Sequence, residues 1–222
     1  MTTVDSLDFA GKRALIRVDF NVPLTCEFKI TDDSRMTSVL PTIQKILNDG
    51  GSVVLMSHLG RPKGGPEAKY SLRPLVSHLA AITGTEVMFS DDCISKEAFE
   101  TSTNMTPGSI HLLENLRFYK EEESGDSSFA ASLAKHGDIY VNDAFGTAHR
   151  AHASTAIVAS FFKQKCFGYL MAKEVANAKK LMNNPDRPFT SIVGGAKVSD
   201  KILIIENLLN IADHIIIGGG MA

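Results

Sequence analysis

The sequence lacks the features that mark several specialised classes of protein. Its only cysteines are Cys26, Cys93 and Cys166, which are widely spaced and form no CxxC pair. Three scattered cysteines argue against a disulfide framework or a zinc site and suit a reducing compartment. No apolar run approaches the length of a transmembrane helix, and the acidic N-terminal stretch 1–13 lacks the long apolar segment of a signal peptide. We therefore expect a cytoplasmic protein with no membrane partner.

A strong charge of either sign is also absent. The 23 basic and 25 acidic residues give a formal net charge of −2, so no global electrostatic field points to nucleic acid as a partner. Hydrophobic residues make up 44% of the chain, which is ordinary for a globular protein. At 222 residues the chain exceeds a typical domain, so we expect either one large domain or one domain plus part of another.

Short apolar runs alternate along the chain with segments of helical periodicity. Most runs are continuously apolar, which is typical of strands buried on both faces of a parallel sheet. We expect strands at 13–18, 52–57, 86–89, 110–113, 138–141, 189–193 and 214–217, and helices at 33–48, 71–82, 127–136, 171–182 and 199–211. This order predicts an α/β fold: a Rossmann-like, three-layer parallel sheet with helices on both faces, followed by the start of a second α/β domain.

Polar and basic side chains follow several of the expected strands. In an open parallel sheet, ligands bind at the carboxyl ends of the strands, so these side chains should meet at one edge. Arginine suits carboxylate and phosphate because its guanidinium group forms two parallel hydrogen bonds with either. The pattern therefore predicts a pocket for a small, multiply charged anion. Its candidate residues are Asp19, Asn21, Arg35, His58, Arg61, Arg117 and Arg150.

Other charged residues have a structural interpretation. Arg17, at the end of the first strand, is expected to pair with Asp143 or another acidic residue. Glu121, Glu122 and Glu123 are expected to form a solvated face. A lone histidine near a strand is more often structural than catalytic, and we place His111, His136 and His214 in that class.

A second candidate site lies in the segment GGAKVSDK, residues 194–201, where a strand, a glycine turn and a helix start follow one another. Gly194 and Gly195 would let a phosphate approach the backbone, and Lys197 and Lys201 are one helical turn apart. The segment is either a phosphate-binding turn or a plain tight βα turn. The patterns GxxxxGK[ST] and GxGxxG are absent, which argues against a Walker A site and against a nucleotide-dependent dehydrogenase.

Six ordered motifs resemble those of the phosphoglycerate kinase family, and together they extend over the whole chain. They are RVDFNVP (17–23), LMSHLGRPKG (55–64), LLENLRFYKEEE (112–123), VNDAFGTAHRAHAST (141–155), GGAKVSDK (194–201) and IIIGGGMA (215–222). The turn CEFK at 26–29 departs from the family, in which many members carry a glycine there. It lies outside the anion pocket.

The resemblance implies a monomeric two-domain kinase that transfers a phosphoryl group between 1,3-bisphosphoglycerate and MgADP, giving 3-phosphoglycerate and MgATP. It implies a phosphoglycerate-binding domain at 1–168, an interdomain helix at 169–183 and the beginning of a nucleotide domain at 184–222. The acidic Mg²⁺-binding segment and most of the adenine pocket have no counterpart here. We therefore expect a truncated chain that binds 3-phosphoglycerate with little or no turnover, and a non-catalytic binding module is the alternative.

The resemblance also implies roles for single residues. The seven residues of the expected anion pocket match the 3-phosphoglycerate site, and Arg35 and Lys197 match the residues at the transferring phosphoryl group. Gly194, Gly195, Lys197 and Lys201 match the start of the nucleotide site. Phosphoryl transfer needs positioning and charge neutralisation rather than a nucleophilic serine or cysteine, which agrees with these residue types.

Overall fold

The computed structural model describes residues 1–63, 65–195 and 199–222. The chain divides into two compact units, Met1–Ala172 and Lys173–Ala222, and each is described by itself.

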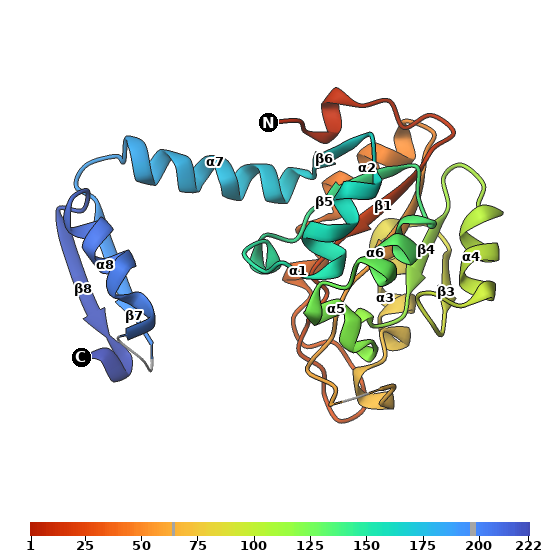
Figure 1. Cartoon of the computed structure of the whole chain (residues 1–222), viewed down its shortest axis with the longest axis horizontal. Coiled ribbons are helices and arrows are strands. Elements are labelled where there is room, and N and C mark those ends of the chain that lie inside the picture. Colours follow the sequence, from red (N-terminus) through yellow and green to blue (C-terminus); the bar gives the residue numbers. More distant parts are fainter. Residues whose placement is uncertain (64, 196–198) are drawn as a thin grey trace. The chain divides into compact units, whose positions relative to one another are not determined.

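The first unit is built on a six-stranded, entirely parallel sheet in the order β3-β4-β2-β1-β5-β6 (Figure 1). Its strands are β1 (Arg13–Arg17), β2 (Ser52–Met56), β3 (Val87–Ser90), β4 (Ile110–Leu113), β5 (Ile139–Asn142) and β6 (Lys165–Phe167). Since β1 lies between β2 and β5, the loops that follow these three strands emerge side by side.

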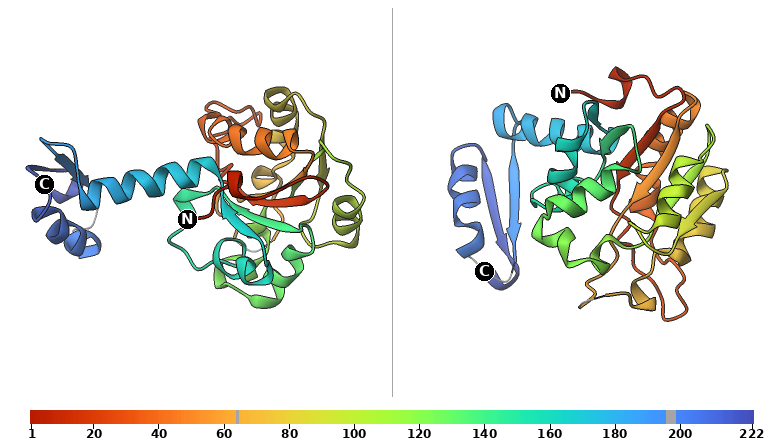
Figure 2. Two further views of the ribbon diagram at one scale, coloured as in Figure 1. Left: turned by 90° about the horizontal axis from the view of Figure 1, so that it is seen from above. Right: turned by 45° about the vertical axis from the view of Figure 1, so that its right-hand side comes forward.

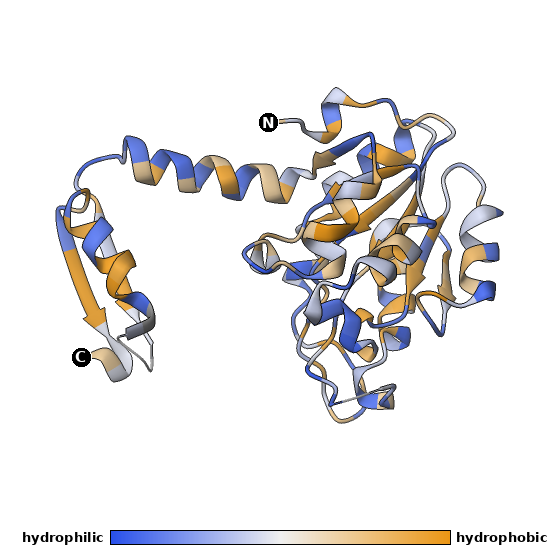
Figure 3. Cartoon of the chain, viewed as in Figure 1, coloured by the Kyte–Doolittle hydropathy of each residue, from blue (hydrophilic) through white to orange (hydrophobic). Residues whose placement is uncertain are grey.

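Helices cover both faces of this sheet (Figure 2). They are α1 (Ser34–Thr37), α2 (Leu40–Asn48), α3 (Val76–Thr83), α4 (Lys96–Thr103), α5 (Lys120–Ser124) and α6 (Ser127–Ala134). Along β1, Ile16 packs with α2 and α3 in one core, whereas Leu15 packs with α4 and α6 in the other. Strands covered in this way have no solvent-facing side, which explains their continuous apolar runs (Figure 3). The predicted three-layer α/β fold is confirmed.

Three local predictions were wrong. The helix expected at 33–48 is divided into α1 and α2, because Pro41 in the first turn of α2 cannot continue the hydrogen bonding of the preceding turn. Strand β6 was missed because it is only three residues long and lies at the edge of the sheet. Helix α4 was missed because its polar sequence KEAFETST has little apolar periodicity, although Ser95 caps its start by accepting from the Ala98 N–H.

The second unit is a smaller α/β arrangement. Strands β7 (Thr190–Gly194) and β8 (His214–Gly218) pair in parallel and are joined through helix α8 (Ile202–Leu209). Helix α7 (Tyr169–Asn183) begins in the first unit and ends in the second. Among the described residues of the second unit only Val193 is buried, so this unit has almost no core of its own.

A chain of buried hydrogen bonds crosses the second core of the first unit and determines the proton positions on two histidines. Nε2 of His136 lies 2.9 Å from the carbonyl oxygen of Cys93, so it carries the proton, and Nδ1 must accept. The Ser102 hydroxyl donates to that Nδ1 at 2.6 Å and accepts from Nδ1–H of His111 at 2.9 Å. Nε2 of His111 then accepts from the Ser90 hydroxyl at 2.8 Å. Both rings are neutral. A proton added to Nδ1 of His136 or to Nε2 of His111 would face the serine hydroxyl that now donates to that nitrogen.

This network predicts acid sensitivity. Burial lowers the pKa of both His111 and His136 from 6.5 to about 4. The unfolded chain therefore binds more protons than the folded chain between these values, and stability that is complete above pH 6.5 is lost as the pH falls toward 4. In His136→Gln, the slope of unfolding free energy against pH should be shallower by roughly 1.4 kcal/mol per pH unit.

The measurement is urea unfolding of the whole chain, monitored by circular dichroism at a series of pH values from 7 to 4. His214→Gln is the control, since His214 is an exposed residue of the second unit. Equal slopes of unfolding free energy against pH in wild type and His136→Gln would contradict the assignment of His136 as a neutral buried ring.

Candidate functional site

A polar pocket of about 270 Å³ lies at the carboxyl ends of β1, β2, β4 and β5. All seven residues of the expected anion pocket line it. The complete lining is Asp19, Asn21, Arg35, His58, Gly60, Arg61, Arg117, Gly146, Thr147 and Arg150. The structure therefore brings together residues that are up to 131 positions apart in the sequence (Asp19 to Arg150).

Hydrogen bonds between loops hold the first two segments of the pocket together. The backbone N–H of Phe20 donates to the Ser57 hydroxyl at 2.8 Å. The N–H of Gly60 donates to the side-chain oxygen of Asn21 at 2.8 Å. Asn21 is thus engaged with the loop after β2, and its position depends on that loop as much as on its own.

Asn115 joins the loop after β4 to the loop after β2, a role that the sequence did not predict. Its buried side-chain amide donates to the carbonyl oxygens of Leu59 at 2.7 Å and Tyr70 at 2.9 Å. Its oxygen accepts from the Arg117 N–H at 3.0 Å, and Nη1 of Arg117 reaches the Gly60 carbonyl at 2.8 Å. Asn115 therefore determines where the Arg117 side chain enters the pocket.

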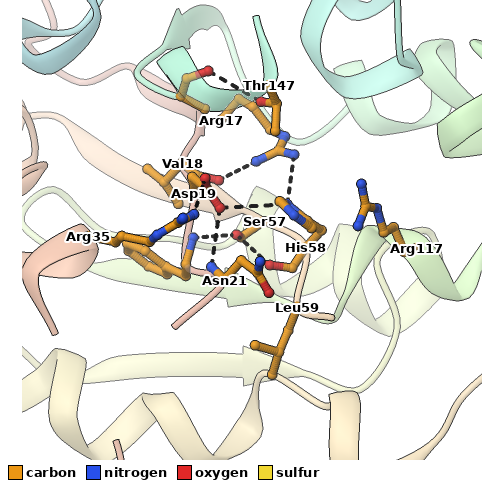
Figure 4. A network of polar contacts seen from close by, with 12 residues as sticks. Arg17, Val18, Asp19, Asn21, Arg35, Ser57, His58, Leu59, Arg117 and Thr147 are labelled. Atoms are coloured by element: carbon orange, nitrogen blue, oxygen red, sulfur yellow. Dashed lines mark hydrogen bonds and ion pairs between the residues drawn. The ribbon is translucent and has the colours of Figure 1, made fainter. Parts of the chain in front are cut away.

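The arginines of the pocket differ in their partners. Arg35 forms an ion pair with Asp19 at 2.5 Å (Figure 4). Arg117 lies 3.2 Å from Glu123. Arg61 and Arg150 have no carboxylate partner in the described part of the chain. The pocket thus has an excess of positive charge, as a site for an anion requires.

The buried Arg17 corrects one prediction. It does not pair with Asp143, whose carboxylate instead accepts the N–H of Met171 at 2.9 Å at the start of α7. Arg17 is buried outside the pocket lining, and its guanidinium group donates to the Ser154 hydroxyl at 2.8 Å. It also contacts Nδ1 of His58 at 3.2 Å (Figure 4). An arginine at the end of a continuously apolar strand was the available signal for such a buried role.

Glu122 corrects a second prediction. Glu121 and Glu123 are exposed as expected, but the side chain of Glu122 is fully buried. Its carboxylate accepts from the N–H of Ser154 at 2.9 Å and from the Ser154 hydroxyl at 2.5 Å. The three consecutive glutamates concealed this difference, because in the short helix α5 only the middle one is buried.

The predicted glycine-turn site is described only in part. Gly194 ends β7, and a Cβ atom on Gly195 would lie 2.9 Å from Cε of Lys201, so the Lys201 side chain passes directly over the turn. Lys197 lies outside the described residues. Among residues 1–63, 65–195 and 199–222, no cluster of three or more histidine, cysteine, aspartate or glutamate side chains could hold a metal ion. Within the same ranges no helix is long and apolar enough to cross a membrane.

The fold and the pocket define an α/β protein with an arginine-rich pocket at the carboxyl edge of its parallel sheet. The sequence model of the phosphoglycerate kinase family matches residues 4–222, and the chain belongs to this family.

The relatives agree in sequence and in structure. Phosphoglycerate kinases of Chloroherpeton thalassium and Porphyromonas gingivalis are 52% and 50% identical over 99% of this chain, which covers 55% and 58% of them. The structure of the enzyme from Coxiella burnetii superposes with a TM-score of 0.85 at 41% identity, over 98% of this chain and 54% of that one. The enzyme from Pyrococcus horikoshii gives 0.88 at 32% identity, over 99% and 55%. The chain thus spans a little more than half the length of these relatives.

The three hydrogen bonds of Asn115 predict a stability effect. Asn115→Ala leaves the Leu59 and Tyr70 carbonyls without this donor, and we expect a loss of roughly 1–3 kcal/mol in unfolding free energy. Urea unfolding measures it, with Asn104→Ala as control because Asn104 is exposed at the end of α4. Equal stability of the two variants would show that the loops hold without Asn115.

Proposed function

We propose that the pocket at the sheet edge binds 3-phosphoglycerate and that the chain is the phosphoglycerate-binding part of a phosphoglycerate kinase. The observation that carries the proposal is the convergence of Arg35, Arg61, Arg117 and Arg150 from four separate segments, in a member of this family. The ligand's phosphate and carboxylate match guanidinium donors, and its hydroxyl matches Asp19 and Asn21.

The reaction we propose is phosphoryl transfer between 1,3-bisphosphoglycerate and ADP, which gives 3-phosphoglycerate and ATP in glycolysis. Such a transfer depends on alignment and on neutralising charge on the moving group. Arg35 and Lys197 are the residues we assign to that charge. The ion pair of Arg35 with Asp19 holds its guanidinium at the rim of the pocket before the ligand arrives.

The nucleotide is assigned to the second unit. Gly194, Gly195, Lys197 and Lys201 would receive its phosphates, and the passage of Lys201 over the Gly195 turn supports this placement. Mg²⁺ would accompany ADP and ATP as part of the nucleotide substrate. We propose the boundaries 1–168, 169–183 and 184–222 for the substrate domain, the linking helix and the nucleotide segment, in a cytoplasmic monomer.

A non-catalytic binding module is the second candidate. It rests on the same pocket, which such a module would keep without performing phosphoryl transfer. We expect the 222-residue chain to bind 3-phosphoglycerate with little or no turnover. Production of ATP from ADP and 1,3-bisphosphoglycerate by this chain would favour the kinase over the module.

Calorimetric titration of 3-phosphoglycerate tests the pocket. Binding by the wild-type chain should weaken roughly 10- to 100-fold in Arg61→Ala and in Arg35→Ala, because each loses charged hydrogen bonds to the ligand. Arg73→Ala is the matched control, since Arg73 is paired with Asp91 outside the pocket lining. Absence of binding by a folded wild-type chain, or equal weakening in all three variants, would overturn the proposal.

A further inference from the structure

Arg17 is a cation that the pocket lining does not include. Its side chain is 1% exposed, yet three of its nitrogens have acceptors. Nε donates to the Ser154 hydroxyl at 2.8 Å, Nη1 donates to the Val18 carbonyl, and Nη2 contacts Nδ1 of His58 at 3.2 Å. Because all three nitrogens of this buried guanidinium group have partners, Arg17 cannot turn toward a ligand in the pocket. Its effect is therefore on the residues that it contacts, which include Ser154 and His58.

The charge of Arg17 is balanced through Ser154. The Ser154 hydroxyl accepts from Arg17, so its single proton points to Glu122 at 2.5 Å. The Ser154 N–H adds a second bond to the same carboxylate at 2.9 Å. Ser154 and Glu122 are both completely buried. The order Glu122–Ser154–Arg17 is therefore a fixed path of hydrogen bonds that ends at His58.

The contact with Arg17 determines the proton position on His58. Guanidinium is only a donor, so Nδ1 of His58 must be the acceptor, and the proton of the neutral ring lies on Nε2. Asp19 would favour the other tautomer, with the proton on Nδ1. Its Oδ1 lies 3.8 Å from Nδ1 and would accept a hydrogen bond from Nδ1–H. Arg17 holds the nearer position at 3.2 Å and prevents this.

We propose that Glu122, acting through Ser154 and Arg17, holds His58 as a neutral ring that presents Nε2–H to the anion in the pocket. The three residues are positioning residues, because none of them lines the pocket while His58 does. The contribution of His58 to ligand specificity rests on the proposed function. Its neutral Nε2–H donor would orient an oxygen of the ligand, whereas the arginines supply positive charge.

The charges around His58 agree with this state. Burial and the neighbouring arginines lower the pKa of His58 to about 2. The charged groups that face it are Asp19, Arg17, Arg35, Arg117 and Arg150. A second proton on the ring would face the donors of Arg17 directly, so the geometry and the electrostatics favour the same neutral form.

Nuclear magnetic resonance of the ligand-free chain, labelled with ¹⁵N in histidine, tests the proposal without any ligand. The ring nitrogens of His58 should report protonated Nε2 and unprotonated Nδ1, unchanged from pH 8 to pH 5. A proton on Nδ1, or titration of His58 within that range, would overturn the proposal whatever the chain binds.

Variants of Ser154 test the path. Ser154→Ala removes the anchor of Nε of Arg17, so His58 should shift toward the Nδ1–H form that faces Asp19, and 3-phosphoglycerate affinity should fall by about tenfold. Ser154→Thr keeps the hydroxyl and should restore both properties. Ser160→Ala, at an exposed serine of the segment Val158–Phe161, is the control.

The outcomes separate the two proposals. An unchanged His58 signal in folded Ser154→Ala would exclude the path from Glu122. If the His58 signal changes in Ser154→Ala but the wild-type chain does not bind 3-phosphoglycerate, the path is supported and the proposed function is overturned. A loss of affinity with an unchanged signal would assign Ser154 a purely structural role and overturn this inference.

Discussion

Burial of the parallel sheet on both faces is the constraint from which the other features of the first unit follow. Strands covered by helices on each side reach solvent at the sheet edges, and every strand of the six-stranded sheet points its carboxyl end to the same edge. The charged side chains that the loops carry accumulate there. The pocket forms where the loops after β1, β2, β4 and β5 meet at this edge.

Burial of the sheet also makes the charged residues behind the pocket more costly in free energy than the charged residues that line it. Arg61 and Arg150 are solvated, so they cost little in the absence of a ligand. Arg17 and Glu122 lie in the interior, where an unpaired ion costs several kcal/mol. Ser154 connects them with bonds to both, and Asn115 likewise donates to two carbonyl oxygens of the loop after β2. Rigid, fully bonded groups below the pocket hold the ligand-facing groups in place.

The residues lining the pocket could be predicted from the sequence, whereas those holding it could not. His58 directly follows one expected apolar strand, Arg61 and Arg117 each stand close behind an expected apolar strand, and that pattern is visible in the chain. Glu122 stands between two exposed glutamates, and Ser154 is one of many serines, so neither has a local signal. Lys201 illustrates an intermediate case: its spacing from the glycine turn was visible, and the structure places its side chain over Gly195.

The sequence by itself determined the fold class, the strands with buried faces and the candidate anion-binding residues, because hydrophobic periodicity and strand-end position are local properties. Only the tertiary structure decided the partners of the buried charges: Arg17 with Ser154 and His58 rather than Asp143, and Glu122 inside rather than in solvent. It also decided the short edge strand β6. Such pairings join residues that are distant in the sequence, since Arg17 is separated by 41 positions from His58 and by 137 from Ser154, and sequence periodicity carries no information at that range.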